Sequence, residues 1–162
     1  MTKKQKKSKA PCPSIRPATV RDAEQIQMLI KHYADKKEML PRSLNEIYEN
    51  IRDFAVIEKK GKILACCALH ICWKDLAEIK SLAVAPRHTR KGYGYALVRY
   101  LLAQAPKLGI PRVFVLTFQP GFFELFGFRR VEMTELPKKV WAECIKCVHF
   151  PNCDEKALII DL

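Results

Sequence analysis

A basic turn that contains two glycines lies near the centre of the sequence, between an apolar strand-like run and an apolar helical pattern. Arg90 and Lys91 supply positive charge, and Gly92, Tyr93 and Gly94 follow them directly. Backbone N–H groups at the start of a helix have no partner inside it and lie at the positive end of its dipole, so they can bind phosphate. Glycine lets the backbone approach such a group closely. The turn predicts a pyrophosphate site, with an ordinary helix-start turn as the open alternative.

A carboxylate and an ammonium group stand two residues apart on the apolar run before this turn. Glu78 and Lys80 share one face of a strand, because successive side chains of a strand alternate between its faces. Such a carboxylate is either a proton acceptor for catalysis or a solvated partner of the lysine. None of the four histidines has a partner in the sequence that predicts a catalytic triad.

The cysteines form a second group with chemical potential. The chain has seven cysteines, an odd number that cannot all pair in one chain. Cys144 and Cys147 form a C-x-x-C pair, and Cys153 follows six residues later. With His149 or Cys12 they could hold Zn²⁺. Free or redox-active thiols and a Cys144–Cys147 disulfide stay open. Outside this segment, Cys66, Cys67 and Cys72 lie in an apolar run and are expected to be small core residues.

The elements that must position these groups follow from periodicity and turn residues. Apolar spacing predicts helices, β-branched runs predict strands, and Lys59–Gly61 is typical of a hairpin turn. Ser43 with Glu46 forms a capping box. The expected order is strand 14–18, a helix opening at Thr19 or Asp22 and reaching Tyr33, helix 44–51, strands 54–58, 62–73 and 77–85, helix 95–105, strand 112–117, short helix 121–126, and strands 128–131 and 156–162. This order indicates an α/β (α+β) domain built on one mixed sheet.

Length and charge limit the function classes. The 162 residues suit one domain, expected at 14–162, with a disordered basic tail at 1–13 and a cysteine-rich insert at 136–154. Five lysines of the net charge of +12 lie in the first ten residues, and the remaining +7 suits an anionic ligand as well as a polyanion. A nucleic-acid-binding module is disfavoured because the aromatic residues do not alternate with Lys or Arg. With no apolar run of about 20 residues and no export signal, a cytoplasmic protein without membrane contact is expected.

Three motifs together resemble the GCN5-related N-acetyltransferase (GNAT) superfamily. Val84–Pro86 matches a strand ending in V-x-P, and the basic turn matches the R/Q-x-x-G-x-G/A segment that follows it. Phe122–Phe128 is similar to the family's F-Y-E-x-x-G-F segment. The resemblance implies a mixed, mostly antiparallel sheet flanked by helices, with acetyl-CoA bound at a splayed strand pair. Two departures stand out: Thr89 replaces the usual Arg or Gln, and Phe123 replaces the tyrosine proposed as general acid.

A closer resemblance is to the acetyltransferase domain of bacterial N-acetylglutamate synthase, in its short, stand-alone form. It extends over roughly residues 14–135 and rests on segments 39–43, 54–58, 65–69, 77–84 and 113–117. The resemblance implies acetylation of the α-amine of L-glutamate, the first step of arginine biosynthesis. Another small amine, amino acid or protein N-terminus is the alternative acceptor, and both a monomer and a homodimer remain open.

The resemblance also implies where acetyl-CoA binds. A backbone N–H near Leu82, Ala83 or Val84 would contact the thioester oxygen, and the basic turn would hold the pyrophosphate.

The acceptor residues follow from the same resemblance. Glu78 matches the glutamate of an E-x-x-x-V-A-V pattern and is the candidate general base, with Glu58 as a weaker alternative. Arg42 matches an L-x-R-S motif and is the first candidate to bind a substrate carboxylate, and Lys80 is the second.

Overall fold

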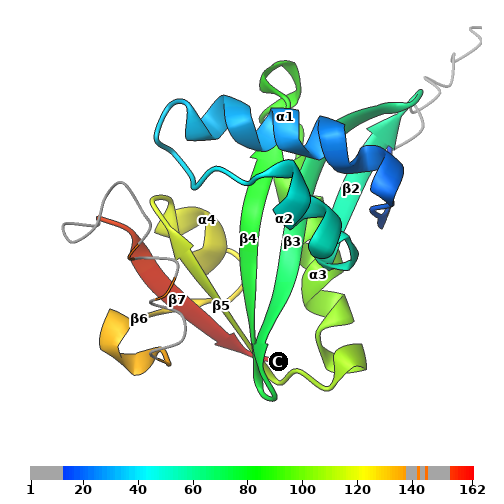
Figure 1. The fold of residues 1–162 in the computed structure, drawn as a ribbon. Coiled ribbons are helices and arrows are strands. Elements are labelled where there is room, and N and C mark those ends of the chain that lie inside the picture. Colours follow the sequence, from blue (N-terminus) through cyan, green and yellow to red (C-terminus); the bar gives the residue numbers. More distant parts are fainter. Residues whose placement is uncertain (1–12, 138–141, 143–144, 146–153) are drawn as a thin grey trace, which may run out of the picture.

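The computed structural model describes residues 13–137, 142, 145 and 154–162. Its centre is a seven-stranded sheet in the order β1-β2-β3-β4-β5-β7-β6 (Figure 1). Only the β4–β5 pair is parallel among the paired strands of the described chain. The mixed, mostly antiparallel sheet expected from the sequence is therefore confirmed. The strands are β1 Ser14–Pro17, β2 Phe54–Lys59, β3 Lys62–Trp73, β4 Leu76–Val84, β5 Arg112–Thr117, β6 Arg129–Val131 and β7 Lys156–Asp161.

Helices cover both faces of the sheet. Helices α1 (Ala23–Ala34) and α2 (Leu44–Glu49) pack on one face, and α3 (Tyr93–Gln104) and α4 (Pro120–Glu124) pack on the other (Figure 1). Each helix and strand expected from the sequence is present, with ends that differ by a few residues. Short 3₁₀ helices, which the sequence analysis did not predict, join these elements: η1 Val20–Asp22, η2 Ile51–Asp53, η3 Pro86–His88, η4 Pro106–Leu108 and η5 Met133–Glu135.

Strand β3 shows how the alternation of side chains builds the two cores. Ala65, Cys67 and Leu69 pack with α3, whereas Cys66 and Ala68 pack with α1. Both thiols are fully buried, which confirms that they are core residues, and burial raises the pKa of Cys66 to about 12. Further along β3, the expected core residue Cys72 is only partly buried.

Two local sequence signals take the expected geometry. Lys60 and Gly61 both have positive φ (51° and 76°) and join β2 to β3 in a tight hairpin, as expected of the primed turns that favour glycine. Ser43 Oγ accepts the Glu46 N–H at 3.1 Å, and the Glu46 carboxylate accepts the Ser43 N–H at 2.7 Å. The capping box that starts α2 is therefore confirmed.

A charged cluster fixes the start of α1 to the sheet. Arg16 on β1 donates to both carboxylate oxygens of Asp22, at 2.7 and 2.9 Å, and to Glu58 on β2 at 2.7 Å. Asp22 also accepts the Thr19 N–H at 2.7 Å. Because its side chain is only 7% exposed, Asp22 depends on these partners for its charge, and they hold its pKa below the ordinary value.

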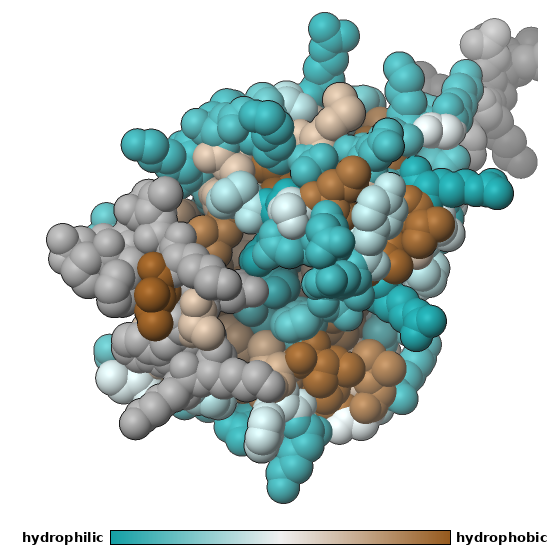
Figure 2. All heavy atoms as spheres, in the orientation of Figure 1, coloured by the Kyte–Doolittle hydropathy of each residue, from teal (hydrophilic) through white to brown (hydrophobic). Residues whose placement is uncertain are grey.

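The outer surface over α1 is mainly hydrophilic, and apolar residues form small separate groups on this face (Figure 2). Among the residues that the structure describes, no helix is both long and apolar enough to span a membrane.

Candidate active site

The candidate site opens where β4 and β5 separate. The two strands pair in parallel from Leu76 opposite Arg112 to Ile79 opposite Val115. Beyond this point β4 continues beside β3 alone, while β5 continues beside β7. The two diverging strands, β4 and β5, are the splayed pair that the sequence resemblance implies.

A β-bulge changes the direction of side chains along the open part of β4. Cys66 lies opposite Ala83 and Ala68 lies opposite Lys80, so β4 has one more residue than β3 in this interval. Ser81 takes φ +55° within it. Before the bulge, Ile79 faces the α3 side, and after it Ala83 faces the α1 side. Because of the bulge, both odd-numbered and even-numbered residues of β4 line the same opening.

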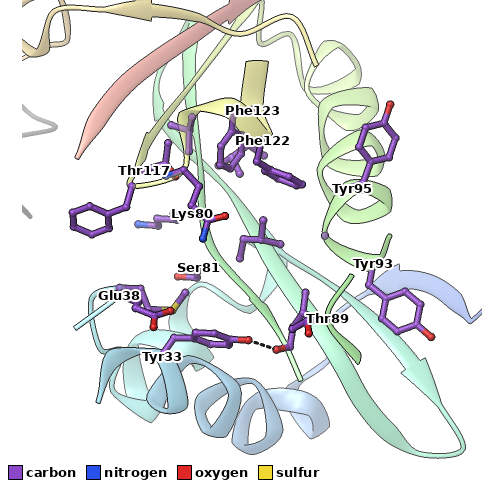
Figure 3. Close-up of a pocket in the computed structure, with 18 of the residues that line it drawn as sticks. Tyr33, Glu38, Lys80, Ser81, Thr89, Tyr93, Tyr95, Thr117, Phe122 and Phe123 are labelled. Atoms are coloured by element: carbon purple, nitrogen blue, oxygen red, sulfur yellow. Dashed lines mark hydrogen bonds between the residues drawn. The ribbon is translucent and has the colours of Figure 1, made fainter. Parts of the chain in front are cut away.

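The opening between β4 and β5 is a cleft of about 870 Å³. Tyr33 of α1, Glu38 of the turn after it, Lys80 and Ser81 from β4, and Thr117 from β5 surround it in the close-up view (Figure 3). Its lining also includes Leu82 and Val84 of β4, residues His88, Thr89, Arg90, Gly92, Tyr93, Gly94 and Tyr95 of the turn and α3, and Phe122 and Phe123 of α4.

The basic turn forms one end of this cleft. Arg90 (φ +60°) and Gly92 (φ +82°) both take left-handed backbone conformations, and Gly92 caps the N-terminus of the twelve-residue α3. Gly94 lies against the cleft, since a Cβ there would be 3.6 Å from Phe122 Cζ and 3.8 Å from Leu82. The N-terminal N–H groups of α3 and the Arg90 cation thus face a space that can accept a pyrophosphate.

Four of the sequence-predicted site residues do not line the cleft. The Ala83 side chain is 2% exposed and packs on the α1 side, although a backbone role there is unaffected. Lys91 places Nζ 3.5 Å from His88 Nδ1. Arg42 is half-buried beside the start of α2, and its carbonyl accepts from Gln27 at 3.4 Å.

Glu78, the candidate base, is the fourth of these residues. It lies on β4 opposite His70 of β3, and His70 Nδ1 is 2.6 Å from Asp53 Oδ2. Lys80, two residues further along the same strand, does line the cleft. Glu58, the weaker alternative, is engaged by Arg16 on β1 and is not among the lining residues.

Comparison with known proteins matches this architecture to one family. The model of the Acetyltransferase (GNAT) family matches residues 20–128. An uncharacterized N-acetyltransferase of Chlorobaculum tepidum is 39% identical over 90% of this chain and 94% of its own length. An amino-acid acetyltransferase of Mycobacterium tuberculosis is 40% identical over 81% of this chain and 76% of its own. The crystal structure of N-acetylglutamate synthase from Neisseria gonorrhoeae, complexed with coenzyme A and N-acetyl-glutamate, superimposes with a TM-score of 0.84 and 28% identity. That match covers 96% of this chain and 36% of the gonococcal chain.

The chain belongs to the GNAT acetyltransferase family. It is an N-acetyltransferase that uses acetyl-CoA as acyl donor.

One position of the acetyltransferase departs from the usual pattern of this family in a way the fold explains. Phe123 is 5% exposed and packs edge-on against Phe122 and Phe128 at ring distances of 5.0 and 5.7 Å. The side chain is part of the core beside α3, and it carries no hydroxyl that could protonate a thiolate. Residue 123 therefore cannot act as the general acid in this protein.

Tyr33 and Thr117 are two of the hydroxyl residues of the acetyltransferase that line the cleft and were not predicted as site residues. Tyr33 donates to the Val84 carbonyl at 2.6 Å, drawn as a dashed line in Figure 3. Burial, with Glu38 nearby, raises the pKa of the Tyr33 hydroxyl. Thr117 Oγ1 accepts the Gln119 N–H at 2.9 Å, so its own hydrogen can be donated elsewhere. The sequence signal at Tyr33 was only helical spacing, which predicts burial and not a contact with β4.

The proposed metal ligands of the acetyltransferase cannot be placed. Cys144, Cys147 and Cys153, with Cys12 and His149, lie outside the described residues. Within the described part of the chain, no group of three or more His, Cys, Asp or Glu side chains is arranged to hold a metal. The zinc site remains a sequence-based prediction.

Proposed function

We propose that this acetyltransferase acetylates the α-amine of L-glutamate, the first step of arginine biosynthesis, as a stand-alone N-acetylglutamate synthase. The observation that carries the proposal is the 40% identity to an amino-acid acetyltransferase over four fifths of this chain. The likeness to a synthase bound to N-acetyl-glutamate supports it. The Lys80 cation in the cleft wall provides a partner for a substrate carboxylate.

The acyl donor would occupy the length of the cleft. The N–H groups at the start of α3, with Arg90, would bind the pyrophosphate. The reactive thioester would then lie between the diverging strands, where a backbone N–H of Leu82, Ala83 or Val84 can donate to its carbonyl oxygen. Such a donor stabilises the negative charge that develops on this oxygen during attack.

The acceptor would enter beside Lys80. Its ammonium group must lose a proton before the nitrogen can attack, and Glu78 would receive that proton, directly or through water. The nitrogen then forms a bond to the acetyl carbon as the carbon–sulfur bond breaks, and the departing CoA thiolate takes up a proton. The Asp53–His70 hydrogen bond holds an imidazole next to Glu78 on the neighbouring strand. Arg42 and Lys80 would bind the two carboxylates of glutamate.

The test is release of CoA thiol from acetyl-CoA by the purified protein, with the twenty amino acids and spermidine as acceptors. Selective turnover of L-glutamate is expected. Glu78→Gln should lower kcat/KM by a factor of about 10² to 10⁴, the range for loss of a general base. Glu58→Gln, measured well below its unfolding temperature, is the matched control and should retain activity because Glu58 pairs with Arg16 of β1 and is not among the residues that line the cleft.

Other outcomes assign the reaction differently. Selective turnover of another amino acid, or of spermidine, would refute glutamate as the acceptor while leaving the acetyltransferase assignment intact. Equal loss of activity in Glu58→Gln and Glu78→Gln would argue against a specific base at residue 78.

A further inference from the structure

In the turn that follows α1, Lys37 occupies a position that favours glycine. The Glu38 N–H donates to the Tyr33 carbonyl at 3.0 Å, and the Lys37 N–H donates to the Ala34 carbonyl at 2.9 Å. These two bonds form a Schellman motif, whose closing residue takes the left-handed conformation. Lys37 is that residue, with φ +61°. A side chain with a Cβ is strained there, so glycine would be the more stable choice.

The location of similar residues suggests why a lysine is present. Four non-glycine residues of the described chain have positive φ: Lys37, Lys60, Ser81 and Arg90. Lys60 forms the β2–β3 hairpin turn, and the other three all line the cleft. Strained backbone of this kind concentrates at functional sites, where a particular side chain is needed despite its conformational cost. Lys37 shares its positive φ and its place in the cleft lining with Ser81 and Arg90.

The surroundings of Lys37 place this residue at the cleft. The Tyr33–Val84 hydrogen bond ties the end of α1 to the end of β4. Lys36 places Nζ 5.9 Å from the centre of the Tyr33 ring and is not among the lining residues, whereas Lys37 lines the cleft. Lys37 is exposed, which places it at the mouth of the opening.

The charges around this mouth have a pattern that fits one class of acceptor. Lys37 and Lys80 contribute cations from two different elements, and Glu38 and Glu155 contribute carboxylates to the same lining. An amino acid with a carboxylate side chain carries both signs of charge, so it can pair with both kinds of group. A polyamine could pair only with the two carboxylates, and the two cations would repel it.

We infer that Lys37 is an acceptor-specificity residue, whose ammonium group binds a carboxylate of an anionic amino acid at the mouth of the cleft. This inference rests on the proposed function, since it assumes that the acceptor is a dicarboxylic amino acid. It adds a cation that neither the motif-based candidates nor the basic turn includes.

Lys37→Gly and Lys60→Gly form a matched pair of variants that tests this role. Each substitution removes one lysine charge and relieves the backbone strain of one lysine in the left-handed conformation. Only Lys37 lines the cleft. Both should raise Tm by roughly 2–4 °C, because relief of strain at the left-handed position exceeds the added chain entropy of glycine. Lys37→Gly should also raise KM for L-glutamate about tenfold, equivalent to about 1.4 kcal/mol, with KM for acetyl-CoA unchanged. Lys60→Gly should leave both KM values unchanged, and Lys37→Arg should keep most of the glutamate affinity because it keeps the charge.

The outcomes separate this inference from the proposed function. An unchanged KM for L-glutamate in Lys37→Gly, beside an active parent, would refute the inference alone. A rise in KM for acetyl-CoA instead would also refute it, since the lysine would then bind the donor. If the unaltered protein does not turn over L-glutamate, the proposed function fails and this inference fails with it.

Discussion

Replacing Asp22 by asparagine tests the charged cluster that attaches α1 to the sheet. The carboxylate accepts two hydrogen bonds from Arg16, at 2.7 and 2.9 Å, and one from the Thr19 N–H at 2.7 Å. Asparagine keeps one acceptor oxygen but turns an NH₂ group toward the guanidinium. The cation would then lose one of its two anionic partners, although Glu58 would still accept from Arg16.

The size of the effect follows from exposure. Breaking a buried ion pair by removing one partner costs about 3–5 kcal/mol. Asp22 is buried but the Arg16 side chain is 32% exposed, so water compensates part of that loss. We expect a decrease in the free energy of unfolding of about 2–3 kcal/mol at pH 7, which corresponds to a Tm lower by about 4–12 °C.

The pH dependence gives a second test of the same cause. Hydrogen bonding to Arg16 lowers the folded-state pKa of Asp22, so the unfolded chain binds the proton more readily. The stabilisation is complete above the unfolded-state pKa of about 4 and is lost as pH falls through the lower folded-state value. The difference in stability between the parent and Asp22→Asn should therefore be constant near neutral pH and shrink below pH of about 4.

Thermal or urea unfolding followed by circular dichroism would measure this difference. Asp35→Asn is the control, because the Lys31–Asp35 pair has side chains 68% and 64% exposed and should change stability by less than about 0.5 kcal/mol. Equal effects of the two substitutions, or a difference for Asp22→Asn that persists unchanged at pH 3, would refute the reasoning.

Three further predictions concern the cleft and the core. Gly92→Ala should destabilise the fold by about 1–2 kcal/mol. The cause would be the φ of +82° alone, since a Cβ there meets no atom within 4 Å. The same substitution should raise KM for acetyl-CoA. An unchanged Tm would contradict it. Tyr33→Phe, which loses the 2.6 Å bond to Val84, should lower the free energy of unfolding in urea by about 1 kcal/mol; a neutral effect would show that this bond contributes no net stability. Native protein treated with iodoacetamide at pH 8 should remain unlabelled at Cys66 and Cys67, because burial raises the pKa of both thiols, and peptide mass mapping that found label on either would contradict this.

The fold could be predicted from the sequence because its signals are local. The capping box at Ser43 and the hairpin turn at Lys60–Gly61 each specify a geometry within four residues, and the structure has both. The strand-to-helix turn that ends at Gly94 also follows from adjacent residues. Its residues Arg90, Gly92 and Gly94 are therefore found together in the cleft.

The acceptor side could not be predicted in the same way, because its residues come from separate elements. Tyr33 and Lys37 reach the cleft only through the way α1 ends and packs against β4, and helical spacing gives no information about that contact. The β-bulge at Ser81 also breaks the simple alternation of side chains along β4, beyond the regular stretch that holds Glu78 and Lys80. Lys80 lines the cleft, whereas Glu78 is not among the lining residues and lies opposite His70, so the catalytic role of Glu78 remains a prediction.

The position of β7 has a consequence for synthesis of the chain on the ribosome. This strand follows β5 and β6 in sequence yet lies between them, paired to both. Until it is made, the outer edge of β5 and the inner edge of β6 present unpaired backbone groups, which is the state in which strands associate wrongly with other chains. Since β5 leaves β4 at the cleft, β7 is its only ladder partner beyond Val115 among the described strands. The nascent protein should therefore acquire its acetyl-CoA cleft only after β7 has been inserted, so binding competence and protection from aggregation would arise together.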